Sequence, residues 1–285
     1  MLYYNITKYI YRLLLIFVTV PLTWGDSPSK PLLITTTKPM AIIAKSALQG
    51  NARVEFILPS GQSPHKAAIT VSGLRTIAEA DLVLWIGPTF EARAAKHLLS
   101  LPKEKLLTGM ELIYPTSDQQ LQNKGSDYAE DPHIWLSPRI ANRVARALQQ
   151  AFNLPEQDII TEQQQAKIAV LLKAAQTQNY IFHHDSIGYF VDAFNLQPPL
   201  TIRNSMGEKR GAKSQHNLRQ QALQRNARCV FAETQNSYKD ASRIAQDLKL
   251  PLIQFDVHAL NQPLEKTSYQ DYMHAIAEQF RTCFQ

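Results

Sequence analysis

The feature that most constrains the fold of this chain is a repeated alternation of short β-rich runs with longer helical segments. From Pro31 onward, the runs 32–37, 54–58 and 81–86 are rich in Leu, Ile, Val and Thr, and a proline or glycine follows each within two residues. A segment of helical period follows each run. This alternation is typical of parallel strands covered by helices on both faces, so the chain predicts an α/β fold.

The alternation is interrupted once, between Pro138 and Gln178, where apolar residues recur with a helical period and no strand-like run occurs. Helices are predicted over 138–152 and over 155–178. The second would be about 36 Å long if it is helical throughout. Strand-like runs return after Asn179, at 179–182, 199–203, 227–232 and 251–256, and a helix over 269–283 closes the chain.

With 285 residues, the chain is long enough for two domains. We therefore predict two Rossmann-like lobes with parallel sheets, joined by a rigid helical linker. The predicted boundaries are a signal peptide over 1–25, an N-terminal lobe over 26–154, a linking helix over 155–178 and a C-terminal lobe over 179–285.

The N-terminus has the features of a secretory signal. Lys8 and Arg12 precede the apolar run 13–20, and Thr23-Trp24-Gly25 offers small residues for cleavage near Asp26. The apolar run is too short to span a bilayer. An exported protein with a cleaved signal is predicted, and an uncleaved anchor is the alternative.

Charge and cysteine content narrow the function classes. The formal net charge is +6, part of it in the signal segment, which is too mild to indicate nucleic acid or a strongly anionic surface as partner. Cys229 and Cys283 are the two cysteines of the chain. In an exported protein such a pair is a disulfide candidate, and two buried thiols or a metal pair are the alternatives.

A small set of polar residues stands where ligands bind in open α/β sheets, beyond the carboxyl ends of the strands. His65 lies in the loop after the second run, His184 follows 179–182, and Asp256 closes 252–255. His133 lies on the stiff loop Asp131-Pro132-His133, ahead of a helix that Ser137-Pro138 would cap. Taken singly, each histidine is more often structural. Together, in a cleft between lobes, three imidazoles and one carboxylate would suit tetrahedral Zn²⁺ or another first-row metal.

Several motifs in order then resemble a known family. Asp131-Pro132-His133-Ile134-Trp135-Leu136-Ser137-Pro138 resembles the DPHxWLDP signature of the metal-binding solute-binding proteins of ABC transporters. The resemblance covers nearly the whole mature chain. The other segments that resemble the family are Ser63-Pro64-His65, the run 80–87, HDSIGYF from His184, CVFAETQ from Cys229, and Phe255-Asp256. The run 266–269, with Cys283 near the C-terminus, is similar to the zinc-specific branch, whose corresponding cysteines form a disulfide.

The resemblance implies a ligand set. His65, His133 and His184 would bind the metal, and Asp256 or water would complete the shell. A histidine at position 184 points to zinc, because manganese-binding relatives tend to have a glutamate there. Three further residues have possible roles. Glu233 is an alternative oxygen ligand, and His258 is either an extra ligand or a surface residue. Asp185 is either an acceptor that orients His184 or a plain helix N-terminal residue.

The implied function is that of a periplasmic zinc-binding protein, a monomer and not an enzyme, that captures Zn²⁺ and hands it to the membrane permease of an ABC importer. Neutral imidazole ligands predict that affinity falls as pH drops through about 6.5. The alternatives are manganese or ferrous iron as cargo, and an exported zinc hydrolase with Glu233 as base, although no HExxH motif is present.

Some residues depart from the family pattern. Lys66 stands where the family usually has aspartate, and Val257-His258-Ala259 replaces Pro-Leu-Gly, so a degenerate relative with weak metal binding is a further alternative. His183 stands where an apolar residue is usual, and strand alternation would point it away from His184. The polar stretch 110–130 contains no histidine.

Overall fold

The structure, a computed structural model, describes residues 29–59, 62–113, 131–234 and 238–285. The predicted signal peptide and most of the polar stretch 110–130 lie outside these residues. Within them, no helix combines the length and the apolar character that a bilayer span requires.

The N-terminal lobe is built on a parallel four-stranded sheet in the order β2-β1-β3-β4. Its strands are β1 (Leu32–Thr35), β2 (Arg53–Phe56), β3 (Leu82–Trp85) and β4 (Leu106–Thr108). Its helices are α1 (Lys38–Leu48), α2 (Val71–Glu79) and α3 (Ala92–Leu98). The sequence did not predict β4, which is three residues long and mostly half-buried, so it lacks the apolar run that marks β1 and β3.

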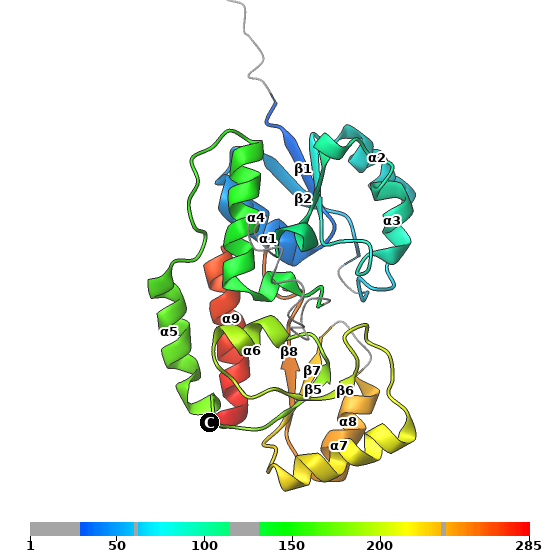
Figure 1. The fold of residues 1–285 in the computed structure, drawn as a ribbon, viewed down its shortest axis with the longest axis vertical. Helices are drawn as coiled ribbons and strands as arrows, with labels where there is room; N and C mark the ends of the chain where they lie inside the picture. Colours follow the sequence, from blue (N-terminus) through cyan, green and yellow to red (C-terminus); the bar gives the residue numbers. More distant parts are fainter. Residues whose placement is uncertain (1–28, 60–61, 114–130, 235–237) are drawn as a thin grey trace, which may run out of the picture.

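The C-terminal lobe repeats this arrangement in the order β6-β5-β7-β8. Its strands are β5 (Ile181–His184), β6 (Leu200–Arg203), β7 (Val230–Glu233) and β8 (Leu252–Phe255). Its helices are α6 (Gly188–Ala193), α7 (Ala212–Gln224), α8 (Lys239–Leu248) and α9 (Tyr269–Arg281). The predicted fold of two α/β lobes with parallel sheets is thus confirmed, and Figure 1 shows one lobe above the other.

The segment between the sheets differs from the single helix predicted over 155–178. Helix α4 (Pro138–Ala151) ends before Asn153, whose φ of 53° is left-handed, and α5 spans Glu162–Leu172. Thr161 and Gln164 form a capping box, which fixes the start of α5 and leaves 152–161 non-helical. The predicted length was therefore wrong, because a reciprocal side-chain cap outweighs the weak helical pattern before it.

Helix α9 also joins the lobes. It packs beside α5 and reaches α1 at its N-terminal end (Figure 1). The Tyr269 backbone N–H donates to Ser46 Oγ at 2.8 Å, and its hydroxyl donates to the Trp135 carbonyl at 2.8 Å. Trp135 Nε1 and the Tyr272 hydroxyl both donate to the Val257 carbonyl. These buried bonds tie the loop that carries His133 to the segment after β8.

The two cysteines form a disulfide, as predicted. Cys229 directly precedes β7, and Cys283 lies in the 3₁₀ turn Thr282–Phe284 that follows α9. The bond closes a loop between residues 54 positions apart and anchors the C-terminal end of α9 to the second sheet.

Removing this bond should lower the free energy of unfolding by about 4 kcal/mol, because the unfolded chain regains the entropy of an open loop of this length. The measurement is urea unfolding with and without reductant. The Cys229→Ser/Cys283→Ser double variant should match the reduced protein and not respond to reductant. An unfolding midpoint that is equal in the oxidised and reduced protein would contradict the expectation.

Candidate metal centre

Three histidines from separate segments meet between the two sheets. His133 opens the 3₁₀ turn Ile134–Leu136 that leads into α4, and His184 is the last residue of β5. His65 lies on a turn after β2, where the backbone N–H groups of Lys66 and Ala67 donate to the Ser63 carbonyl. The first sheet and its connections supply two histidines and the second sheet supplies the third.

The geometry of this three-histidine cluster matches a tetrahedral metal. One nitrogen from each of the three rings can be chosen so that all lie within 4.8 Å of one another. The Nε2 atoms of His133 and His184 are 3.2 Å apart. Two nitrogens bound to one zinc at about 2.0–2.1 Å with tetrahedral angles are separated by roughly 3.3–3.4 Å. The observed pair therefore fits zinc with little movement.

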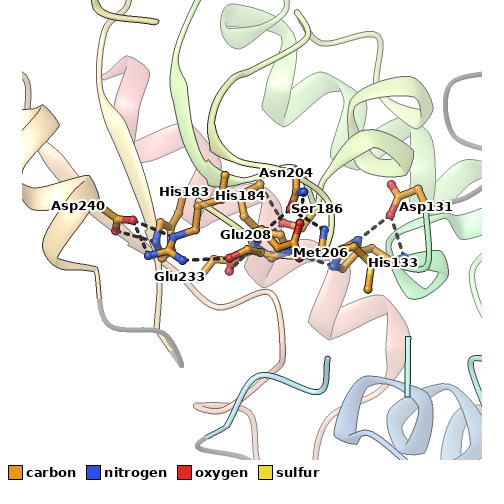
Figure 2. Close-up of polar contacts among 12 residues, drawn as sticks. Asp131, His133, His183, His184, Ser186, Asn204, Met206, Glu208, Glu233 and Asp240 are labelled. Atoms are coloured by element: carbon orange, nitrogen blue, oxygen red, sulfur yellow. Dashed lines mark hydrogen bonds and ion pairs between the residues drawn. The ribbon is translucent and has the colours of Figure 1, made fainter. Parts of the chain in front are cut away.

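The other nitrogen of each of these two rings is held by a carboxylate. His133 Nδ1 lies 2.6 Å from Asp131 Oδ1, and His184 Nδ1 lies 2.6 Å from Glu233 Oε2 (Figure 2). Because a carboxylate accepts, each Nδ1 carries a hydrogen, and the two Nε2 atoms face each other. When both rings are neutral, these two acceptors 3.2 Å apart repel each other. A cation between them, or a proton on one ring, removes that repulsion.

His65 completes the cluster. Both of its ring nitrogens are buried and have no hydrogen-bond partner among the described residues. Its ring packs edge-on against Phe90, with centroids 4.5 Å apart. Burial, reinforced by His133 and His184, lowers the pKa of His65 to about 2. The ring is therefore neutral at physiological pH, so protonation of His65 makes no contribution to a fall in affinity near pH 6.5.

Glu233 lies at the centre of the hydrogen bonds around His184. In the parallel register that pairs Phe182 with Phe231, the strand ends bring His184 and Glu233 side by side. Ser186 Oγ donates to Glu233 Oε1 at 2.8 Å. Burial opposes ionisation of Glu233, but the charge and hydrogen bond of His184 outweigh it and hold the pKa well below its usual range. In this arrangement Glu233 orients a histidine instead of joining the cluster.

Asp185 does not occupy the position expected of an acceptor for His184, because Glu233 receives that hydrogen bond. The pKa of Asp185 is raised by burial and then by Asp131, while Arg210 acts in the opposite direction.

Asp256 and His258 also lie outside the three-histidine cluster. The Asp256 carboxylate accepts the backbone N–H groups of Leu260 and Asn261 at 2.7 and 2.8 Å, and so fixes the turn after β8. His258 is buried against Trp135, with ring centroids 5.3 Å apart, and is not the surface residue of one prediction. These hydrogen bonds fix the orientation of the Asp256 carboxylate within the turn.

Asp131 is a functional candidate that sequence reasoning missed. It accepts both the backbone N–H of His133 at 3.0 Å and the ring Nδ1. The signal was present, since an aspartate two residues before a backbone N–H is the pattern of an Asx turn.

The prediction that His183 points away from His184 agrees with the structure. Its Nε2 lies 3.1 Å from Asp240 Oδ1, on the side of β5 away from His133 (Figure 2). Asp240 also accepts from Arg203 Nε at 2.8 Å. His183 therefore belongs to a neighbouring ion-pair cluster.

Solved structures share this fold. The periplasmic zinc-binding protein TroA from Treponema pallidum superposes with a TM-score of 0.72 at 20% identity, over 90% of this chain and 99% of that one. A crystal structure of ZnuA gives 0.70 at 22% identity, over 89% and 99%. Two α/β lobes around a three-histidine cluster define a metal-binding protein of the two-lobed solute-binding class.

The sequence identifies the family. A profile of the family described as zinc-uptake complex component A, periplasmic, matches residues 33–283, so the chain belongs to this zinc-uptake family. The ZnuA protein of Yersinia pestis, named a high-affinity zinc uptake system protein, is 27% identical over 88% of this chain and 90% of its own length. The ZnuA protein of Haemophilus ducreyi is 26% identical over 88% and 92%. The predicted family is confirmed.

His258 should make the metal-free protein sensitive to acid. Burial lowers its pKa from 6.5 to about 3, so between these values the unfolded chain takes up a proton that the folded chain refuses. The contribution of neutral His258 to the free energy of unfolding is fully present above the pKa of histidine in the unfolded chain. It then falls as pH drops, with this residue contributing up to about 1.4 kcal/mol per pH unit. The His258→Phe variant keeps a ring against Trp135. Its free energy of unfolding, measured with urea, should fall less steeply than that of wild type between pH 6.5 and 4.

Measurements of the same variant at about pH 8, where histidine is neutral in both states, isolate the packing change. If wild type and variant lose stability in parallel as pH drops, the buried imidazole is not responsible.

Proposed function

We propose that this protein captures Zn²⁺ with His65, His133 and His184 and delivers it to the permease of an ABC importer. The observation that carries the proposal is the pair of Nε2 atoms that face each other at 3.2 Å while both Nδ1 atoms are bound to carboxylates. Hydrogen bonding of the second ring nitrogen to a carboxylate is the usual way in which proteins orient a metal-binding histidine.

The donor set favours zinc. Three neutral imidazole nitrogens suit zinc, whereas manganese sites draw mainly on oxygen donors. Asp131 and Glu233 lie behind two of the rings, where their negative charges stabilise a divalent cation without occupying its shell. His65 supplies a third donor whose nitrogens have no other partner among the described residues.

A hydrolase would require a carboxylate free to act as base near the metal. Glu233, the candidate for that role, is bonded through its two oxygens to His184 Nδ1 and to Ser186 Oγ. These bonds support a protein that binds and releases its ion over one that performs chemistry with it.

The proposed setting is the periplasm, reached through the signal predicted over residues 1–25. The family description places its members there, as components of zinc uptake. A monomeric carrier that exchanges zinc with a membrane permease is consistent with the predicted signal peptide and with the family description.

His133→Ala should abolish tight zinc binding, and Glu233→Gln should weaken it by roughly 10- to 100-fold, the range for loss of a carboxylate behind a metal-bound histidine. The first variant removes a donor from a three-donor site. The second keeps the shape of the side chain but removes the charge that orients His184. Zinc affinity is measured by competition with a chromophoric chelator, starting from metal-stripped protein.

His97→Ala, which removes an exposed histidine of α3, serves as the matched control and should bind zinc as wild type does. Urea unfolding of the metal-free variants verifies that each is folded. Wild-type affinity in folded His133→Ala would refute the proposed ligand set.

A further inference from the structure

We propose that Glu91 is a positioning residue for the metal centre. Its buried carboxylate fixes the turn that carries Phe90, and Phe90 in turn holds the ring of His65 in the three-histidine cluster. This inference rests on the proposed function, because it names what orients one of the three proposed ligands.

The three histidines differ in what fixes their rings. His133 and His184 each have a ring nitrogen 2.6 Å from a carboxylate oxygen. Both ring nitrogens of His65 are buried and have no hydrogen-bond partner among the described residues. A hydrogen-bonded turn that begins at Ser63 fixes the backbone of His65, but not its ring. The orientation of this ring therefore depends on the side chains that pack against it.

Phe90 makes the shortest of the described ring contacts of His65. The centroids of these two rings are 4.5 Å apart, whereas those of His133 and His184 lie 5.6 and 6.1 Å from His65. The contact is edge-to-face, a favoured geometry that is lost when either ring turns. Phe90 is itself fully buried and also packs against Trp135, with centroids 5.5 Å apart. The position of Phe90 therefore sets the orientation of the His65 ring.

Phe90 lies on the turn between β3 and α3, and its neighbour Glu91 closes that turn. The backbone N–H groups of Phe90 and Glu91 both donate to the Gly87 carbonyl at 3.1 Å. Glu91 Oε2 accepts the Gly87 N–H at 2.8 Å. Glu91 thus binds both main-chain polar groups of Gly87, which leaves the backbone of Phe90 little freedom between them.

The other carboxylate oxygen of Glu91 ties this turn to the sheet. Oε1 accepts the backbone N–H of Ile86 at 3.1 Å and the hydroxyl of Thr36. Ile86 directly follows β3 and Thr36 directly follows β1, the two central strands of the first sheet. Glu91 is fully buried, and burial raises its pKa to about 7, while these hydrogen bonds act in the opposite direction. Its carboxylate therefore joins two strand ends to the turn that positions Phe90.

The test is a double-mutant cycle between Glu91 and His65. Zinc affinity of the purified protein is measured by competition with chelators at about pH 8, where Glu91 is mostly ionised. Glu91→Ala should weaken zinc binding roughly tenfold, the lower end of the range for groups that orient a metal ligand. Glu91→Gln keeps the shape of the side chain but has one accepting oxygen instead of two, so its affinity should lie between those of wild type and Glu91→Ala.

The second half of the cycle separates positioning of His65 from a general loss of stability. In a His65→Ala background, Glu91→Ala should change zinc affinity by less than about twofold, the scatter expected for groups that do not interact. If Glu91 only stabilised the fold, its loss would weaken zinc binding by the same factor in both backgrounds.

Gln149→Ala is the matched control. Gln149 is buried like Glu91, and its side chain makes three hydrogen bonds, with the Ala47 carbonyl and with the backbone of Gln157. This variant should lower the free energy of unfolding but bind zinc as wild type does. Urea unfolding of the metal-free variants verifies that each is folded.

Wild-type zinc affinity in folded Glu91→Ala overturns this inference alone, and so does an equal loss of affinity in the wild-type and His65→Ala backgrounds. If His65→Ala binds zinc as tightly as wild type, the proposed ligand set fails and the proposed function fails with it.

Discussion

The arrangement depends on two short carboxylate–imidazole hydrogen bonds, one in each half of the molecule. Asp131 holds His133 and Glu233 holds His184, each at 2.6 Å, so that both Nε2 atoms point to the same spot. The two rings face each other only because the fold brings the loop of His133 next to the end of β5, which carries His184. A cation between the two Nε2 atoms, or a proton on one ring, makes this close approach favourable.

Hydrogen bonds between the lobes hold the segments that carry His133 and His184 in place. Trp135, two residues from His133, donates to the Val257 carbonyl beyond β8 and accepts from Tyr269 of α9. Lys38 of α1 donates to the Leu260 carbonyl on the same segment. Since α9 packs on the second sheet and also contacts α1, the loop bearing His133 is attached to both lobes. A large separation of the lobes would break these bonds.

Much of the fold could be predicted from the sequence because most of its strands are apolar runs that alternate with segments of helical period. The short strand β4 and the true start of α5 were not predictable in this way. The first is too brief and too exposed to form a pattern, and the second depends on a cap between Thr161 and Gln164 within a polar stretch. Local pattern identifies the central elements better than the peripheral ones.

At the candidate site, the convergence of His65, His133 and His184 was expected from the resemblance and from the rule that ligands gather at strand ends. The hydrogen bonds of the Asp256 carboxylate to the backbone N–H groups of Leu260 and Asn261 depend on the shape of the turn after β8, which the sequence alone does not reveal. The pairing of Glu233 with His184 requires the register of β5 with β7, which one sequence does not reveal. The candidate donors could be proposed from the sequence, whereas the hydrogen-bond partners of their rings required the three-dimensional structure.

X-ray absorption at the zinc edge of protein loaded with one equivalent of zinc tests this account most directly. The account predicts a first shell of four light atoms at about 2.0–2.1 Å, with the outer-shell scattering of three imidazoles. A shell with one imidazole or none, or six oxygen donors at longer distance, would contradict the three-histidine site.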